Sequence, residues 1–421
     1  MIPGLRPLIF PVRVPMATDK TAYLEDLSKC VRCGTCKANC PTFEGDPLEP
    51  MGTRGRLILL QGLLRGEIKP SRLLNERIFS CILCGACSGT CPLGVDIPEA
   101  IYRGRALLSA GDKKRRFLRP IAKWSSRRPD LAFRALRLGE RLVLPFLAKR
   151  GVIPFSPELP EVPLRKTEQV FKAHKKKGRV AVFVGCSINY VFPHMGESLI
   201  NVLQKIGYEV VLPQGETCCG APLRSLGLEK EAEELARKNY RVFSRLKVEA
   251  ILSLCPTCTL SLKTEYPKMI GKGLDRVMDI SVFLNDKLGA VDKIYRTSYY
   301  HDPCHLSYGL GVTQEPREII RKAGLDLVGA DEQGCCGFGG LYCLSFKDIS
   351  SDLLQKRTEK ITGTAADTVV TSCPGCVLQL SRTITDRPVL HLIELIEEAY
   401  CYRGEKPEKK EKDPQKEPTL F

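Results

Sequence analysis

The feature that most constrains this chain is a pair of neighbouring cysteines that occurs twice. Cys218 and Cys219 stand in QGETCCGAPLR, and Cys335 and Cys336 stand in the similar stretch EQGCCGFGGLY. A disulfide between neighbours is unfavourable, because Cα atoms across a trans peptide lie about 3.8 Å apart and an unstrained disulfide prefers roughly 4.4–6.8 Å. The sequence therefore predicts that these thiols are ligands, and that the rest of their ligand shell lies elsewhere in the chain.

Cysteine usage and composition limit the classes of protein that this chain can belong to. The 421 residues include 20 cysteines without a recognisable export signal, so we expect metal or redox chemistry in a reducing cytoplasm rather than a disulfide framework. Apolar residues make up 43% of the chain, but no apolar run reaches the ~18–20 residues of a membrane helix. The length predicts two or three domains.

Two cysteine runs near the N-terminus share one spacing. CVRCGTCKANCP and CILCGACSGTCP both follow C-x2-C-x2-C-x3-C-P, the pattern that binds a [4Fe–4S] cube in bacterial ferredoxins. Zinc knuckles fit this pattern poorly, because they pair two short C-x2-C hooks. Three thiolates of one loop reach three corners of a cube, and the fourth cysteine completes the other cube. We therefore predict two cubane clusters, with Cys30, Cys33, Cys36 and Cys91 as ligands of the first and Cys81, Cys84, Cys87 and Cys40 as ligands of the second.

The stretch between these runs, TRGRLILLQGLLRGE, has the apolar spacing of a helix, with Thr53 as its expected N-cap. Together with the cysteine runs it predicts a small helical domain over residues 21–110. Arg54 and Arg56 are either stabilisers of anionic clusters or of a partner's acidic face, or ordinary solvated arginines. The sequence leaves these alternatives open.

From residue 179 the pattern changes to strands that alternate with helices. RVAVFVGCS, YEVVL and VEAILSLCPTC have the composition of buried strands, and ESLINVLQKIG and KEAEELARKNYRVFSRL have helical periodicity. This alternation predicts a parallel, doubly wound sheet, whose binding crevice forms beyond the carboxyl ends of its strands. Each cysteine of this region falls just after such a strand, the first at the end of a strand that reaches Cys186.

The cysteine pattern of this region is duplicated. It reads C-x31-CC-x35-C-x2-C in the first copy and C-x30-CC-x36-C-x2-C in the second, a repeat of roughly 110–120 residues. Five thiolates in one crevice are too many for a single zinc ion or a plain cube, so we predict that neighbouring cysteines ligate different irons of one larger or opened cluster. The expected ligands are Cys186, Cys218, Cys219, Cys255 and Cys258 in the first copy and Cys304, Cys335, Cys336, Cys373 and Cys376 in the second.

These motifs resemble the CCG (cysteine-rich) domain of heterodisulfide reductases, in which the five-cysteine motif holds a non-cubane [4Fe–4S] cluster. The whole layout resembles the iron–sulfur subunit of glycolate oxidase, a layout that the D subunit of heterodisulfide reductase shares. The resemblance covers about residues 24–399, and CPTFEGDPLEPMGTRGRL favours the glycolate oxidase branch. It implies a small helical two-cluster domain followed by two α/β CCG domains, with up to two non-cubane clusters besides the cubes.

The resemblance also implies a function. We expect the iron–sulfur electron-transfer subunit of a flavin-dependent 2-hydroxyacid oxidoreductase of the glycolate or lactate type, inactive alone. No flavin or nicotinamide fingerprint is present, so an FAD-containing oxidase or dehydrogenase subunit is the expected partner. A quinone-linked or haem-bearing membrane subunit is a further candidate partner.

The alternative is a thiol–disulfide reductase acting on a small disulfide. Glycolate oxidase subunits often lack part of the last C-x2-C of each copy, whereas both are intact here.

Four further side chains carry alternatives. His301 and His305 flank Cys304, and each is either a catalytic proton donor beside a substrate-reducing cluster or a simple hydrogen-bonding histidine. Cys343 and Cys401 lie outside the motifs and are expected to be ordinary thiols, although Cys343 is near enough to Cys335 to be a spare ligand.

Positive charge is concentrated between the two halves of the chain. The formal net charge is +16, and residues 111–150 carry 13 Lys and Arg residues against three acidic ones. This stretch is either a surface for an anionic membrane or an acidic partner, or a solvated linker; nothing beyond charge supports nucleic acid. We expect a cytoplasmic protein, which can lie on the inner face of the membrane. The expected layout is a disordered arm over 1–20, the cluster domain over 21–110, a basic linker over 111–178, CCG domains over 179–290 and 291–402, and a charged disordered tail over 403–421.

Overall fold

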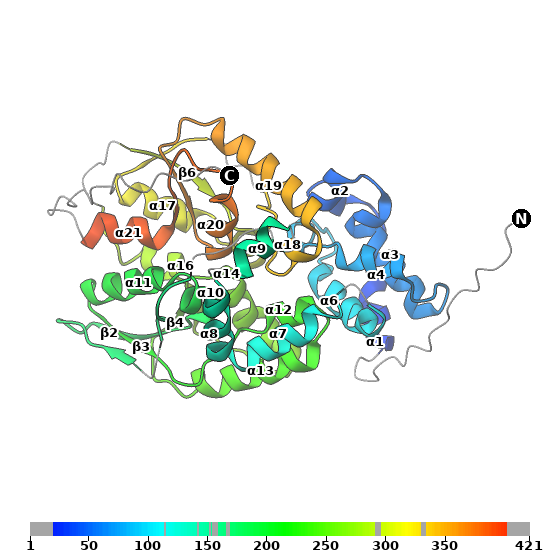
Figure 1. The fold of residues 1–421 in the computed structure, drawn as a ribbon, viewed down its shortest axis with the longest axis horizontal. Coiled ribbons are helices and arrows are strands. Elements are labelled where there is room, and N and C mark those ends of the chain that lie inside the picture. Colours follow the sequence, from blue (N-terminus) through cyan, green and yellow to red (C-terminus); the bar gives the residue numbers. More distant parts are fainter. Residues whose placement is uncertain are drawn as a thin grey trace, which may run out of the picture.

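The computed structural model describes residues 20–112, 115–140, 143–150, 153, 159–165, 169–290, 296–329 and 334–401. Figure 1 shows a helical N-terminal part in blue and cyan at one end, beside two α/β copies drawn in green and in yellow to red. This mixture of helix and sheet agrees with the expected fold class. The expected arm, apart from Lys20, and the expected tail lie outside the described residues. Among the described residues, no helix combines the length and apolarity that crossing a membrane requires.

Short helices around a small apolar core form the N-terminal part. Leu60, Ile78 and Ile101 of three different helices are fully buried in this core. The helix expected after the first cysteine run begins at Thr53, but its N-cap is Gly52, so the predicted capping role of Thr53 is wrong. The elements are α1 (Lys20–Ser28), η1 (Thr35–Lys37), α2 (Pro41–Gly45), η2 (Glu49–Met51), α3 (Thr53–Arg65), α4 (Arg72–Phe79), α5 (Ala86–Gly89), α6 (Ile97–Leu108) and η3 (Ser109–Gly111).

The basic stretch forms three helices that lie against the first copy. Ion pairs from Lys123 to Glu231 and from Arg127 to Glu234 (2.8 Å) connect the first of them to helix α13 (Glu229–Phe243). Apolar side chains remain exposed on the same helices, including Ile121 and Trp124. These helices are α7 (Leu118–Arg127), α8 (Pro129–Gly139) and α9 (Val143–Lys149).

The first copy contains a five-stranded sheet in the order β1-β3-β2-β4-β5. Strands β2 to β5 are parallel, as expected, whereas β1 pairs antiparallel with β3 at the edge. Val180 and Val182 of β2 face one buried cluster and Ala181 faces another, so helices cover both faces of the sheet. The strands are β1 (Gln169–Phe171), β2 (Gly178–Val182), β3 (Tyr208–Leu212), β4 (Ala250–Ser253) and β5 (Val277–Asp279).

The helices of the first copy follow these strands in sequence. The strand expected to end at Cys186 ends at Val182, because Gly185 takes a left-handed conformation (φ 67°) and begins helix α10. Cys186 therefore lies in the first turn of a helix. The helices are α10 (Gly185–Tyr190), α11 (Pro193–Lys205), α12 (Ala221–Ser225), α13 (Glu229–Phe243), α14 (Pro256–Leu260), η4 (Ser261–Glu265), α15 (Tyr266–Ile270) and α16 (Ile280–Asn285).

The second copy repeats this topology with a four-stranded parallel sheet in the order β7-β6-β8-β9. This order corresponds to β3-β2-β4-β5 of the first copy, so the repeated cysteine pattern has a repeated fold beneath it. The elements are β6 (Thr297–His301), η5 (His305–Gly309), α17 (Gln314–Lys322), β7 (Asp326–Leu327), α18 (Tyr342–Ser345), α19 (Lys347–Thr362), β8 (Thr368–Thr371), α20 (Pro374–Leu380), β9 (Val389–His391) and α21 (Leu392–Cys401).

The two copies pack through reciprocal helix pairs. Helix α11 contacts α21, and the corresponding α17 contacts α16; in the same way α14 contacts η5, and α10 contacts α20 (Figure 1). One buried apolar cluster contains residues of both copies, from Val180 to Ala399. The copies are therefore related by an approximate two-fold arrangement and share one core.

A buried arginine joins the N-terminal part to the first copy. Arg224 pairs with Glu99 of α6 at 2.6 Å and with Glu229 at 3.4 Å, and its guanidinium lies 4.3 Å from the centre of the Tyr102 ring. Arg224 is almost wholly inaccessible, so its charge is compensated by these carboxylates and not by water.

We predict that Arg224→Met lowers the free energy of unfolding by about 3–5 kcal/mol, because it leaves buried carboxylates without their cation. Arg237→Met is the matched control, since the exposed Arg237 pairs with Glu233 only at 3.9 Å. That control is expected to change stability by no more than about 0.5 kcal/mol. Urea unfolding followed by circular dichroism measures both variants; equal stability of the two would contradict this role of Arg224.

Candidate metal centres

The cysteines predicted to hold the first cube line one pocket. Cys30, Cys33 and Cys36 of the first run meet Cys91 of the second run there. Arg54 lies on the pocket wall and pairs with Glu49 at 2.6 Å. The Arg54 guanidinium, in turn, holds the pKa of Glu49 at about 2. The crossing of the fourth cysteine that the ferredoxin spacing predicts is therefore present in the geometry.

A second pocket collects the complementary set of cysteines. Cys81, Cys84 and Cys87 of the second run line it together with Cys40 of the first run, and Thr53 lies on its wall. Burial raises the pKa of Cys87 to about 12, and a hydrogen bond with Thr53 acts against this rise. Thr53 therefore has a place beside the sulfurs instead of a capping role.

The two cysteine loops have the same backbone conformation. Gly34 and Gly85 are both left-handed, with φ of 89° and 84°, and the residues two positions before them, Arg32 and Leu83, both have φ of 62°. A positive φ is unusual for a residue with a side chain and is retained where surrounding structure imposes it. The two cysteine runs therefore form loops of the same shape, as is expected of two loops that each surround one cluster.

A buried cation lies on the wall of the second pocket. Arg56 is almost wholly buried and donates to Thr42 Oγ1 at 2.9 Å and to Ser80 Oγ at 3.0 Å. Burial acts to raise the pKa of Cys40, but a hydrogen bond with Thr42 and the charge of Arg56 outweigh it and lower that pKa. Of the alternatives for Arg56, solvated arginine is wrong. A buried guanidinium beside four thiols is suited to an anionic group.

In the first copy, five thiols lie beyond the carboxyl ends of β2, β3 and β4. Hydrogen bonding with Cys186 and Cys219, and then burial, raises the pKa of Cys218, while hydrogen bonds from Cys218 and Cys258 lower that of Cys219. Cys186 is exposed, and Cys255 is half-buried. These interactions link four of the five sulfurs, and Cys255 joins them through its hydrogen bond with Cys258.

The turn that carries Cys186 is braced by a residue that sequence reasoning missed. The buried carboxylate of Glu216 accepts hydrogen bonds from Gly185 N at 2.7 Å and Val184 N at 3.2 Å, and pairs with Arg165 at 3.1 Å. Glu216 stands directly before TCCG in the sequence, and this position was the signal that could have identified it as part of the site.

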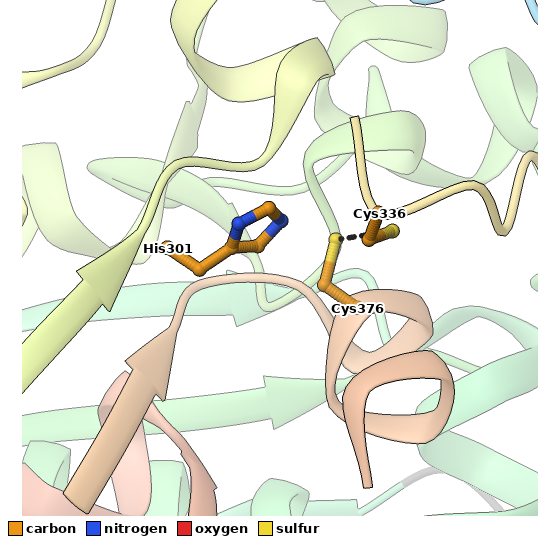
Figure 2. Close-up of side chains that lie close together, drawn as sticks. All are labelled: His301, Cys336 and Cys376. Carbon is orange, nitrogen blue, oxygen red and sulfur yellow. Dashed lines mark hydrogen bonds between the residues drawn. The ribbon is translucent and has the colours of Figure 1, made fainter. Parts of the chain in front are cut away.

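The second copy gathers its five thiols in the same way. Cys336 Sγ lies 3.3 Å from Cys376 Sγ, as Figure 2 shows. The interaction with Cys335, and then burial, raises the pKa of Cys304. Cys373, at the start of α20, interacts with Cys376. The expected set is therefore brought together.

The two copies' sites also meet each other. Hydrogen bonds from Cys255 of the first copy and then Cys376 lower the pKa of Cys373. The hydrogen bond from Cys258 would lower the pKa of Cys255, but Cys373 and burial outweigh it and raise that pKa to about 12. The sulfur groups of the two copies therefore adjoin each other at Cys255 and Cys373.

The second N-terminal pocket adjoins the second copy. Cys84 belongs to a buried cluster against which Cys304 and Cys335 pack. Burial, and then the charges of Cys304 and Cys335, raise the pKa of Cys84. The sequence offers no sign of this contact, because it depends on how the two parts dock.

The two candidate histidines have different surroundings. His305 Nε2 donates to Leu83 O at 3.0 Å, and its Nδ1 lies 2.8 Å from Thr257 Oγ1, so this ring bridges three parts of the chain. His301 is buried, and burial lowers its pKa to about 3. His301 Nε2 has no hydrogen-bond partner among the described residues. The His301 ring lies near Cys336 and Cys376 (Figure 2).

Of the two cysteines outside the motifs, Cys343 alone has a described side chain. Cys343 Sγ donates to Gly340 O at 3.2 Å in helix α18, and burial raises the pKa of Cys343 to about 11. The side chain of Cys401 is outside the described residues.

The donor set fits iron–sulfur clusters. Every cysteine whose side chain the structure describes is a free thiol, and four groups of them match the four predicted sets. Soft thiolates in groups of four or five select such clusters, which carry single electrons.

We predict that Cys336→Ser lowers the iron content by the amount of one centre, because it removes a sulfur from the middle of the second copy's group. Cys343→Ser is the matched control, being another buried thiol a short distance along the same segment, and is expected to leave iron unchanged. Iron and sulfide analysis of anaerobically purified protein measures both. Equal iron in the two variants would contradict the grouping.

Comparisons with known proteins identify two kinds of domain in this chain. The 4Fe-4S dicluster domain matches residues 26–95, and the cysteine-rich domain matches residues 180–263 and again 298–381. A solved structure of a hypothetical protein from Helicobacter pylori has a TM-score of 0.50 at 12% identity, covering 93% of this chain and 74% of that one, which is a likeness of fold.

Three curated proteins illustrate the similarity over the whole layout. The B subunit of fumarate reductase (CoM/CoB) from Methanothermobacter marburgensis is 29% identical, over 89% of this chain and 72% of that protein. The probable glycolate oxidase iron–sulfur subunit of Bacillus subtilis is 27% identical, over 89% of this chain and 94% of its own length. The D subunit of dihydromethanophenazine:CoB–CoM heterodisulfide reductase from Methanosarcina barkeri is also 27% identical, over the same shares. The chain therefore contains a 4Fe-4S dicluster domain followed by two cysteine-rich domains, and its relatives over most of its length include glycolate oxidase iron–sulfur subunits and D subunits of heterodisulfide reductases.

Proposed function

We propose that this chain is the electron-transfer subunit of a flavin-dependent 2-hydroxyacid oxidoreductase. The observation that carries the proposal is the unbroken series of sulfur sites. It runs from the pocket of Cys30 to the pocket of Cys81, passes from Cys84 to the second copy, and crosses from Cys373 to Cys255 of the first copy. Clusters held in this order would relay single electrons across the molecule.

The residues of the chain have separate tasks in this proposal. The eighteen motif cysteines would hold two cubane and two non-cubane clusters, which supply the capacity to accept and release electrons. The buried Arg56 would balance the negative charge of the second cube. His305 would fix the distance between the second cube and the second copy, because it is bonded to Leu83 and to Thr257 at once.

An FAD-containing subunit is the proposed partner. Hydride chemistry on a 2-hydroxyacid needs a cofactor such as flavin, and several relatives are named as glycolate oxidase subunits. The exposed apolar and basic side chains of α7 and α8 include Ile121, Trp124 and Arg134. They form a surface suited to an acidic partner or to the inner face of the membrane near a quinone-linked or haem-bearing subunit.

A disulfide reductase is the second candidate. Both C-x2-C pairs are intact, Cys186 is exposed at the first copy's site, and the D subunits of heterodisulfide reductases are among the relatives. This function would use the same relay but end on a small disulfide.

Electron transfer through the loaded chain tests the proposal. Reduced flavin mononucleotide, standing in for the flavoprotein, is expected to reduce the clusters and to drive reduction of a soluble quinone. Cys84→Ser should slow the quinone reaction about a hundredfold, about 2.7 kcal/mol in activation free energy, while Cys343→Ser leaves it unchanged.

Three results separate the candidates. A fully iron-loaded chain that takes no electrons from the flavin contradicts the relay. Equal quinone rates for the two variants contradict the route through Cys84. Thiol release from a low-molecular-weight disulfide with reduced viologen, without any quinone reaction, favours the disulfide reductase.

A further inference from the structure

The two copies differ at one position of their otherwise matching sites. The residue three positions before the first cysteine is Phe183 in the first copy and His301 in the second. Phe183 is fully buried and packs on Phe243, with ring centres 5.4 Å apart. His301, at the end of β6, is buried in the equivalent place but carries two nitrogen atoms there. The second site thus has a potential donor that the first site lacks.

The imidazole of His301 points into the second copy's sulfur group. One ligand atom each from His301, Cys336 and Cys376 lie within 4.8 Å of one another, and all three residues are buried. Figure 2 shows a ring nitrogen directed toward the two sulfurs. The three side chains come from different segments: the end of β6, the loop after β7 and the first turn of α20. Three possible metal ligands from separate segments therefore meet at one place in the fold.

His301 Nε2 also needs a partner that the described part of the protein does not supply. This atom is buried without a hydrogen bond. A buried polar atom without a hydrogen-bond partner is destabilising, so an isolated nitrogen in this position is unfavourable. The other buried histidine, His391, is different: its Nε2 lies 3.0 Å from Leu254 O, and its Nδ1 accepts from Ile393 N at 3.2 Å. Both ring nitrogens of His391 therefore have hydrogen-bond partners, whereas His301 Nε2 has none within the residues that the structure describes.

We propose that His301 Nε2 binds iron in the second copy's centre, together with Cys336 and Cys376, and that the first copy's centre has sulfur ligands alone. The inference rests on the proposed function only in that the second copy must hold an iron–sulfur centre. Imidazole nitrogen is an established type of ligand for iron. His301 is thus a ligand specific to one copy, and Phe183 excludes the equivalent nitrogen from the other.

The asymmetry has a consequence for electron flow. A neutral imidazole adds no negative charge to a cluster, and histidine ligation raises the reduction potential of iron–sulfur centres relative to thiolate ligation alone. The second copy's centre, which adjoins Cys84, would then have a higher potential than the first copy's centre. Electrons that arrive from the N-terminal clusters would then reduce the second copy's centre in preference to the first copy's centre.

Nitrogen-15 labelling of histidine tests this ligand directly. In anaerobically purified wild-type protein, pulsed electron paramagnetic resonance of the paramagnetic centres is expected to show strong coupling to one histidine nitrogen. His301→Phe, which copies the residue of the first copy, should lose this coupling. His194→Gln, at an exposed histidine, should retain it. Redox titration should show one centre at a lower potential in His301→Phe and no change in the control.

The outcomes separate this inference from the proposed function. Wild-type protein with full iron but without histidine coupling, or coupling that survives in His301→Phe, overturns the ligand assignment and leaves the relay intact. Absence of iron from the second copy overturns both. If His301→Phe fails to fold, the wild-type spectrum still tests the ligand, because full iron without histidine coupling overturns the assignment and requires no variant.

Discussion

Thiolates repel one another and are costly to bury, yet the ten cysteines of the two copies converge where α14 meets η5 and α10 meets α20. Only Cys186 among them is exposed. A positively charged inorganic core is the compensation that such a group of thiolates needs, since their like charges otherwise repel one another. The cysteines reach this junction through three features of the fold: the reciprocal helix pairs, the shared apolar core and the docking of the N-terminal part. The convergence of the thiols is therefore the constraint on which the rest of the fold depends.

The sequence predicted the features that are local in the chain. The cysteine spacings identified all four groups, because each run is a tight loop or follows a strand end. YEVVL matches β3 (Tyr208–Leu212) because a run of β-branched residues has few alternatives. Strand β1 was missed, since three residues are too few for a periodicity. The burial of Arg56 and the wrong N-cap at Thr53 both concern helix α3. The spacing of apolar residues predicts a helix there, but it does not show which side of that helix the rest of the protein will cover.

Most of the features that the sequence did not predict are contacts between segments that are distant in the chain. Cys84 lies beside Cys304 and Cys335, and Cys255 lies beside Cys373, only because the parts dock in one particular way. These contacts turn four separate cysteine groups into one ordered path. His301 and Phe183 then make the two copies chemically different, so a duplicated fold need not mean a duplicated role. The duplicated pattern supplies two similar scaffolds, and one buried side chain distinguishes them.

Anomalous X-ray scattering at the iron absorption edge, from crystals grown without oxygen, tests the central claim most directly. The account predicts four iron positions: one within the Cys30 set, one within the Cys81 set and one within each copy. Iron missing from either copy, or anomalous signal at the zinc edge from the same four positions, would contradict it.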